Sequence, residues 1–257
     1  GASNLVLHCR FQGHSDAGVY VSAASNVVRN CAFWGNTNGL GQNSVQTIVE
    51  NCVVVSNAAC GIRIYGGGVG GFVGLTARNC LIAWNGDSGM YVERDNGGGN
   101  WFNVFNCTIV NNGQHGYRFY GYSCPTYITN TIIAGNGGWG TYFTGWGAPR
   151  QYLDYSCVYG NVSGPHTNFV APAVLGPNML SAYPLFVGGG NFHLGNQSPC
   201  IDAGCDLSGA GITNDLDYAL RTNAYDIGCY ESALPPATKY DVSYADAARP
   251  DDIGAGI

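Results

Sequence analysis

The residues best suited to acid–base chemistry fall in one stretch of the chain. Three carboxylates, Asp87, Glu93 and Asp95, are followed one repeat later by His115 and Arg118. Eliminative cleavage of an acidic sugar polymer needs a base, such as histidine or arginine, and a group that neutralises the substrate's carboxylate. Hydrolysis of a glycoside needs two carboxylates about 5–9.5 Å apart, a role open to Glu93 and Asp95. We favour the simpler interpretation that these are charges on solvated loops, and assign no catalytic residue.

A second set of residues alternates tyrosine and arginine at one position of successive short strands. The position is central on its strand, so its side chain should point outward. Tyr65, Glu93 and Tyr120 lie beside it. Aromatic faces and guanidinium groups suit sugar rings, acidic glycans or a protein surface. Tyrosine is also favoured on strands, where arginine stacks on it for stability alone. The candidate binding row consists of Tyr20, Arg63, Tyr91, Arg118 and Tyr142.

An internal repeat of 21–28 residues holds these positions in register. Each repeat is marked by a cysteine or its equivalent, at Cys9, Cys31, Cys52, Cys80, Cys107, Thr131 and Cys157. Five residues after the marker an asparagine recurs, at Asn36, Asn57, Asn85, Asn112 and Asn136. Nine residues after it a glycine recurs, at Gly18, Gly61, Gly89, Gly116 and Gly140. A short alternating strand follows each of these glycines.

This repeat predicts an all-β solenoid, a parallel β-helix of about seven coils. Coils stacked at about 4.8 Å would place like residues in ladders. Stacked asparagine amides would satisfy the backbone of the turns, and the recurring glycines would supply positive φ at corners. The marker cysteine and the aliphatic residue two positions later should point inward. A leucine-rich horseshoe lacks its consensus here, and a propeller blade needs about 40 residues.

The Asn-Cys-x-Ile-x-x-Asn-x-x-x-Gly rhythm resembles the right-handed parallel β-helix superfamily, which includes pectate lyases and many bacterial surface proteins. The end of the chain resembles the C-terminal closing segment of choice-of-anchor Q type β-helix proteins. That second resemblance rests on Arg221 and on residues 184–187, 191–194, 198–204 and 226–231. It implies a secreted or cell-surface protein, which is our expected localisation, and it implies little about activity.

These patterns divide the chain into three parts. Residues 1–169 are expected to form the coils, 170–231 the closing segment, and 232–257 a linker and tail that resembles the start of another β-helix module. Because the chain begins inside a coil, its first strand edge would be free to pair with another chain. A cloned fragment or an unstructured tail explains the same features equally well. The expected assembly residues are Tyr240, Val242, Tyr244, Ile253 and Ile257.

The cysteines fall into two groups. Those of the repeat should stack inward as free thiols. Cys205 and Cys229 occupy places in the closing segment where the family usually has small or polar residues, and we expect them to form a disulfide. No C-x2-C pair is present and the histidines are scattered, which disfavours zinc.

Clustered acids near the end suggest calcium, but Ala219 and Leu220 stand where a calcium loop of the EF-hand type needs ligands and glycine. We therefore assign no cofactor. Arg221 is expected to pair with Asp226 or Glu231 instead. The acids concerned are Asp202, Asp206, Asp215, Asp217 and Asp226.

Composition narrows the function further. A net charge of −6 without a basic cluster disfavours nucleic-acid binding, and no apolar run is long enough to span a bilayer. The favoured hypothesis is a non-catalytic extracellular or surface module that serves as a structural or adhesive building block. Its partner would be another copy, assembled end to end into a fibre, or an adjacent module. The alternatives are a polysaccharide-binding protein or a polysaccharide-degrading enzyme, either a lyase or a glycoside hydrolase.

Overall fold

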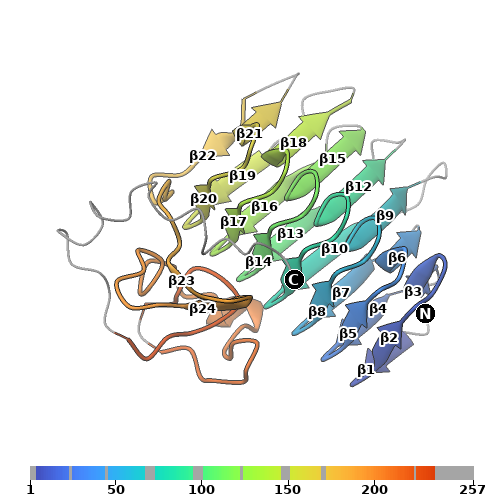
Figure 1. Cartoon of the computed structure of the whole chain (residues 1–257), viewed down its shortest axis with the longest axis horizontal. Helices are drawn as coiled ribbons and strands as arrows, with labels where there is room; N and C mark the ends of the chain where they lie inside the picture. The colour runs from blue at the N-terminus through green and yellow to red at the C-terminus, as the bar shows by residue number, and fades with distance from the viewer. Residues whose placement is uncertain are drawn as a thin grey trace.

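The computed structural model describes residues 4–22, 25–43, 46–66, 73–94, 101–121, 124–145, 151–168, 172–222 and 224–234. Within these ranges the chain winds into a solenoid of three parallel sheets (Figure 1). Seven successive coils each contribute one strand to every sheet. The predicted all-β parallel solenoid is confirmed. No described segment forms a helix long and apolar enough to cross a membrane.

The sheets are named A, B and C in the order in which the chain enters them. Sheet A contains β1 (Asn4–Leu7), β4 (Asn26–Arg29), β7 (Gln46–Glu50), β10 (Gly74–Arg78), β13 (Phe102–Phe105), β16 (Thr126–Thr129), β19 (Gln151–Asp154) and β22 (Val174–Leu175). Sheet B contains β2 (Arg10–Gln12), β5 (Ala32–Trp34), β8 (Val53–Val55), β11 (Leu81–Ala83), β14 (Thr108–Val110), β17 (Ile132–Ala134) and β20 (Cys157–Tyr159). Sheet C contains β3 (Ala17–Val21), β6 (Asn38–Asn43), β9 (Ile62–Gly66), β12 (Met90–Arg94), β15 (Tyr117–Gly121), β18 (Trp139–Thr144) and β21 (Gly164–Asn168).

The core fills the space inside the coils. Period-two alternation sends every second side chain of a strand inward, so like residues of successive coils pack on one another. The cysteines of the repeat line this core, where Cys31, Cys52, Cys80 and Cys107 are buried and Cys9 is half-buried. The aliphatic or aromatic residue two positions later is buried as predicted, at Phe33, Val54, Ile82, Ile109 and Ile133.

The predicted asparagine ladder is confirmed and extends one coil further, to Asn161. Each side-chain Nδ2 donates to the Oδ1 of the asparagine in the next coil, over 2.8–3.0 Å. The same Oδ1 accepts from the backbone N–H of the preceding ladder asparagine, as Asn136 does from Asn112. The ladder thereby satisfies backbone groups that a bend would otherwise leave unpaired in the interior.

The recurring glycines have a different role from the predicted one. They lack positive φ; instead a Cβ on Gly61 would lie 2.6 Å from the carbonyl oxygen of Gly89 in the next coil. Positive φ belongs to the residue before each marker cysteine, such as Asn51, Asn79 and Asn106. Asparagine tolerates this left-handed conformation better than other side chains do. Close approach of stacked backbones, rather than a corner, therefore explains the glycines.

One marker position is corrected by the structure. Ser156, not Cys157, follows Thr131 in the inward row, because the Oγ of Ser156 accepts from the backbone N–H of Thr131 at 3.1 Å. Cys157 lies one residue further along and faces outward from sheet B, against the C-terminal segment. Adjacent residues of a strand point to opposite faces, so Ser156 and Cys157 cannot both point into the core.

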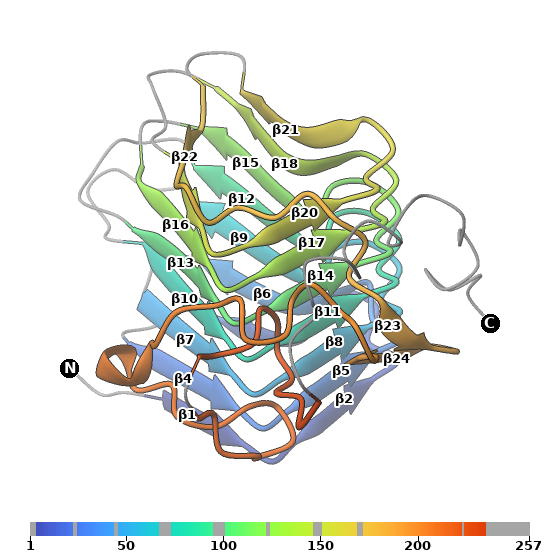
Figure 2. The same ribbon diagram turned by 90° about the vertical axis from the view of Figure 1, so that its left-hand side faces the viewer.

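The C-terminal segment runs back along the outside of the coils (Figure 2). It contains the hairpin β23 (Phe186–Gly188) and β24 (Asn191–Leu194) and the short 3-10 helix η1 (Ser208–Ala210). Its apolar side chains cover the outward residues of β11, β14 and β17, so that the middle of sheet B is buried on both faces. The shared cluster includes Leu81, Val110, Ile132, Phe186, Phe192, Ile201 and Ile227.

Candidate functional site

The outer face of sheet C places the predicted tyrosine and arginine side chains in one row. Parallel pairing aligns Tyr20, Gly41, Arg63, Tyr91, Arg118 and Tyr142 on six successive strands. The second coil contributes a glycine rather than a side chain. A Cβ at Gly41 would lie 2.6 Å from Cδ2 of Tyr20, so the ring of Tyr20 lies over this glycine.

The planar groups of this row stack along the solenoid axis. The guanidinium carbon of Arg118 lies 4.3 Å from the ring centre of Tyr91, and that of Arg63 lies 5.0 Å from the same ring. Arg63 also lies 4.5 Å from Tyr65, and Arg118 lies 6.0 Å from Tyr142. The inter-strand spacing matches the distance at which cations and aromatic faces attract. Tyr91 is consequently only 8% exposed.

The two arginines of the row differ in their ionic partners. Arg63 forms an ion pair with Glu93, at 3.3 Å between Nη2 and Oε2. Among the described residues, no carboxylate lies within ion-pair distance of Arg118, and none accepts a hydrogen bond from it. Its Nε is buried without a partner in that part of the chain. Arg118 is therefore a half-buried cation whose two Nη groups, unlike its buried Nε, are available to an anion as far as the described residues go.

His115 lies beside Tyr142, the last residue of the row. Its ring stacks on Tyr142, with ring centres 4.3 Å apart and planes 11° apart. Its Nδ1 accepts a hydrogen bond from the backbone N–H of Trp139 at 2.9 Å. Burial, followed by the positive charge of Arg118, lowers the pKa of His115, and Asp87 partly opposes this. The ring is thus held neutral, with its proton on Nε2.

Comparisons with known proteins agree with this architecture. Residues 1–74 match the family model described as a right handed beta helix region. The crystal structure of pectate lyase Pel9A is similar, with a TM-score of 0.52, 16% identity, and coverage of 86% of this chain and 69% of that chain. This chain is a right-handed parallel β-helix. At such low identity the likeness to the lyase concerns the fold alone, and no curated protein sequence matches the chain.

The candidate catalytic residues each contact a different partner in the β-helix. Glu93 is engaged by Arg63, and the Oδ1 of Asp87 accepts a hydrogen bond from Ser88 Oγ at 3.1 Å. His115 is engaged by Trp139 and Tyr142. Asp95, the second member of the predicted carboxylate pair, lies outside the described residues, as do Tyr240, Val242, Tyr244, Ile253 and Ile257 of the predicted assembly tail.

The predicted bridge between Cys205 and Cys229 is not formed in the structure, where both thiols are free. The two residues contact different parts of the β-helix. The backbone N–H of Cys205 donates to Asn130 Oδ1 at 2.9 Å, whereas that of Cys229 donates to Thr108 Oγ1 at 3.1 Å. Docking onto the coils, rather than a covalent staple, therefore fixes both residues.

The acids near the end mostly make hydrogen bonds within the protein. Asp226 is fully buried and accepts from the backbone N–H groups of Asp202 and Ser232. Arg221 pairs with Glu231 at 2.9 Å and donates to the backbone carbonyl of Asp226, as the sequence predicted in outline. No three histidine, cysteine, aspartate or glutamate side chains of the described residues gather in metal-binding positions.

Proposed function

We propose that this β-helix is a non-catalytic extracellular or cell-surface module that binds an acidic polysaccharide along the outer face of sheet C. The observation that carries the proposal is Arg118, a half-buried guanidinium between Tyr91 and Tyr142 that has no anionic partner among the described residues. A buried or half-buried charge without a partner is unfavourable for folding, so an external anion would stabilise it.

The chemistry of the row fits a uronic acid polymer. A guanidinium presents parallel N–H groups that match the two oxygens of a carboxylate. An exposed tyrosine ring, such as that of Tyr20 in this row, accepts the apolar face of a sugar ring, and its hydroxyl reaches the polar edge. Arg63 lies two strands from Arg118 with the buried ring of Tyr91 stacked between them, so the row offers two cations at a fixed spacing. A regular polymer could contact several of these positions at once.

The contacts of His115 favour binding over catalysis. A neutral histidine that accepts at Nδ1 carries its proton on Nε2, so neither nitrogen is free to remove a proton from a substrate. Glu93 is engaged by Arg63 and is therefore a poor partner for acid catalysis. The second candidate function is a polysaccharide lyase, supported by the nearness of His115 to Arg118 and by the likeness to pectate lyase Pel9A.

The sequence of the C-terminal segment supports an extracellular location and an adhesive role. Its resemblance to choice-of-anchor Q type β-helix proteins implies a surface or secreted protein. A module of that kind could contact a matrix glycan through sheet C while its tail joins another copy or module. The tail residues lie outside the described residues, so end-to-end assembly into a fibre rests on sequence alone.

The test is binding of a galacturonate oligosaccharide, measured by calorimetry, to the full chain and to Arg118→Gln. We expect this substitution to weaken binding at least about ten-fold, because it removes a charge-assisted contact. Arg10→Gln is the matched control, since Arg10 is exposed on sheet B and makes the same change in net charge. Added salt should weaken wild-type binding and leave the residual binding of Arg118→Gln less affected.

Two results would overturn the proposal. One is equal affinity of wild type and Arg118→Gln for the acidic oligosaccharide, with both proteins folded. The other is formation of an unsaturated product during incubation with polygalacturonate, followed by ultraviolet absorbance. That product would establish the lyase alternative instead.

A further inference from the structure

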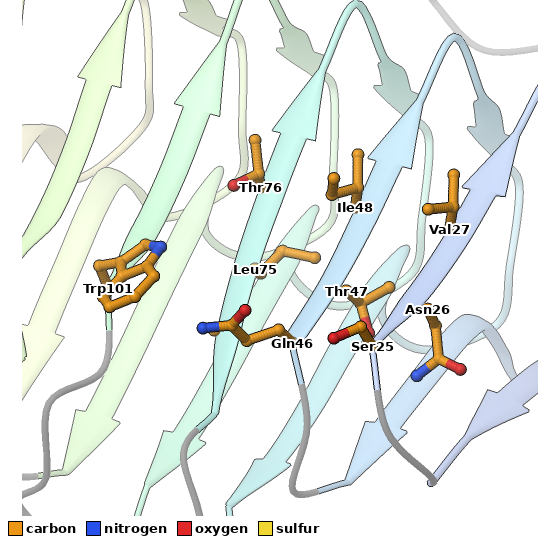
Figure 3. A pocket seen from close by; sticks show the side chains of 10 residues that line it. Ser25, Asn26, Val27, Gln46, Thr47, Ile48, Leu75, Thr76 and Trp101 are labelled. Carbon is orange, nitrogen blue, oxygen red and sulfur yellow. The ribbon is translucent and has the colours of Figure 1, made fainter. Parts of the chain in front are cut away.

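A hollow on sheet A has a chemistry different from that of the sheet C row. It lies where β4, β7, β10 and β13 begin, and its volume is about 250 Å³ (Figure 3). By strand alternation its outer lining consists of the residues that point away from the core. These are Ser25, Val27, Gln46, Ile48, Thr76 and Trp101.

The hollow exists because a glycine separates two large side chains. Parallel pairing places Gly74 beside Gln46 on one side, and the same register places it next to Trp101 on the other. A Cβ at Gly74 would lie 3.2 Å from the carbonyl oxygen of Trp101 and 3.6 Å from Cγ of Gln46. The missing side chain therefore leaves a gap between an amide and an indole ring.

Trp101 is presented to solvent on a fixed backbone. Its carbonyl accepts from the N–H of Leu75 at 3.3 Å, and β13 begins at the next residue. The residue is 44% exposed, and no aromatic ring of the described residues stacks on it. A large exposed indole beside a polar hollow is unusual for a surface that only faces water, because tryptophan buries a large apolar area where it can.

The polar groups around the indole are neutral. Gln46 offers an amide, Ser25 and Thr76 offer hydroxyls, and among the described residues no charged side chain lines the hollow. Neutral donors and acceptors beside an aromatic face match an uncharged sugar ring, whose apolar C–H face stacks while its hydroxyls make hydrogen bonds.

We infer that this hollow binds one uncharged sugar residue of a glycan whose rings carry equatorial hydroxyl groups, such as β-linked glucose or xylose. Equatorial substitution leaves both ring faces flat and apolar, which an indole can contact over its whole area. The volume is somewhat below the roughly 300 Å³ at which sites for larger ligands begin, so it suits a single ring. The site is on a different sheet from the proposed acidic site and is independent of it.

The test measures calorimetric binding of cellohexaose and xylohexaose to the full chain, Trp101→Ala and Trp101→Phe. We expect Trp101→Ala to lose about ten-fold or more in affinity for whichever oligosaccharide binds, and Trp101→Phe to recover part of it. Tyr127→Ala is the matched control, since Tyr127 is an exposed aromatic residue on the same sheet outside the hollow. Gln46→Ala provides a second variant on an exposed side chain, which should weaken binding without affecting folding.

The galacturonate oligosaccharide separates this inference from the proposed function. Trp101→Ala should bind it as wild type does, whereas Arg118→Gln should keep its affinity for the uncharged oligosaccharide. If wild type binds neither cellohexaose nor xylohexaose, or if Trp101→Ala binds them as tightly as Tyr127→Ala, the inference is wrong. Neither result would affect the proposal for sheet C.

Discussion

The side-chain amide of Asn130 makes two hydrogen bonds with the backbone of Cys205. Its Nδ2 donates to the carbonyl oxygen at 2.7 Å, and its Oδ1 accepts from the N–H at 2.9 Å. Asn130 has a φ of 50° at the bend between sheets A and B. Asn79 at the equivalent bend donates to the carbonyl of Asn214 in the same way. The bends that turn the coils therefore also hold the C-terminal segment in place.

Loss of this contact should loosen the segment. We expect Asn130→Ala to lower the free energy of unfolding by about 1–3 kcal/mol more than Asn51→Ala does. Asn51 has the same φ of 50°, and no side-chain hydrogen bond joins it to the described part of the C-terminal segment. Because both variants place alanine at the same positive φ, the backbone strain cancels in this comparison. Urea unfolding of both variants measures the difference, and equal losses would show that the two hydrogen bonds contribute nothing.

Arg221 provides a second anchor for the segment. Its side chain is fully buried, pairs with Glu231, and donates to the backbone carbonyl of Gly228 at 2.9 Å and to Asn79 Oδ1 at 3.3 Å. Removing one partner of a buried ion pair leaves the other charge without compensation. Arg221→Met should therefore lower the free energy of unfolding by about 3–5 kcal/mol.

Arg10→Met is the control for this prediction, because Arg10 is exposed on β2. Urea unfolding gives the free energies, and limited proteolysis reports whether residues 172–234 detach before the coils unfold. A loss below about 1 kcal/mol for Arg221→Met, similar to that of an exposed pair, would contradict the prediction.

Periodic features were predictable from the sequence. The asparagine five residues after each marker can satisfy the backbone of a stacked bend in only one way, and the structure has this arrangement from Asn36 to Asn161. The outward row of sheet C followed from alternation alone, since it needs only the strand register. What alternation did not reveal was the pairing of charges: Glu93 contacts Arg63 rather than Arg118.

Features that depend on distant parts of the chain were not predictable. Nothing in the spacing of Asn130 and Cys205, 75 residues apart, indicates that they touch. The sequence predicts a disulfide between Cys205 and Cys229, whereas hydrogen bonds to the coils hold both residues in the structure. The hollow on sheet A was also missed, although a signal existed. Gln46, Gly74 and Trp101 each lie six residues before a marker cysteine, at Cys52, Cys80 and Cys107.

The thiols give a direct chemical prediction. Burial raises the pKa of Cys60 and of Cys229 to about 12, which suppresses the reactive thiolate in both. Cys9 and Cys205 are half-buried and should react first with iodoacetamide in the folded protein. Peptide mapping after a short exposure should find label at these two residues, and complete labelling only in denaturant. A peptide pair joining Cys205 to Cys229 in the unreduced protein would contradict the structure.

His115 should make stability depend on pH. Its pKa is lowered in the folded protein, so the folded state binds fewer protons than the unfolded state as the pH falls through the ordinary value of 6.5. Its contribution to stability is therefore present above pH 6.5 and declines below it. Protonation would break the hydrogen bond from Trp139 and place a second cation beside Arg118. Tm measured from pH 7.5 to 5 should fall more for wild type than for His115→Phe, which keeps the stack on Tyr142.

A galacturonate oligosaccharide should oppose this decline, because an anion beside Arg118 favours the protonated ring. Repeating the Tm series with the oligosaccharide should raise the wild-type values most at the acidic end, and should do so less for His115→Phe. Parallel curves for the two proteins, with and without the ligand, would show that His115 does not titrate in this range and that its ring is not coupled to the proposed anion site.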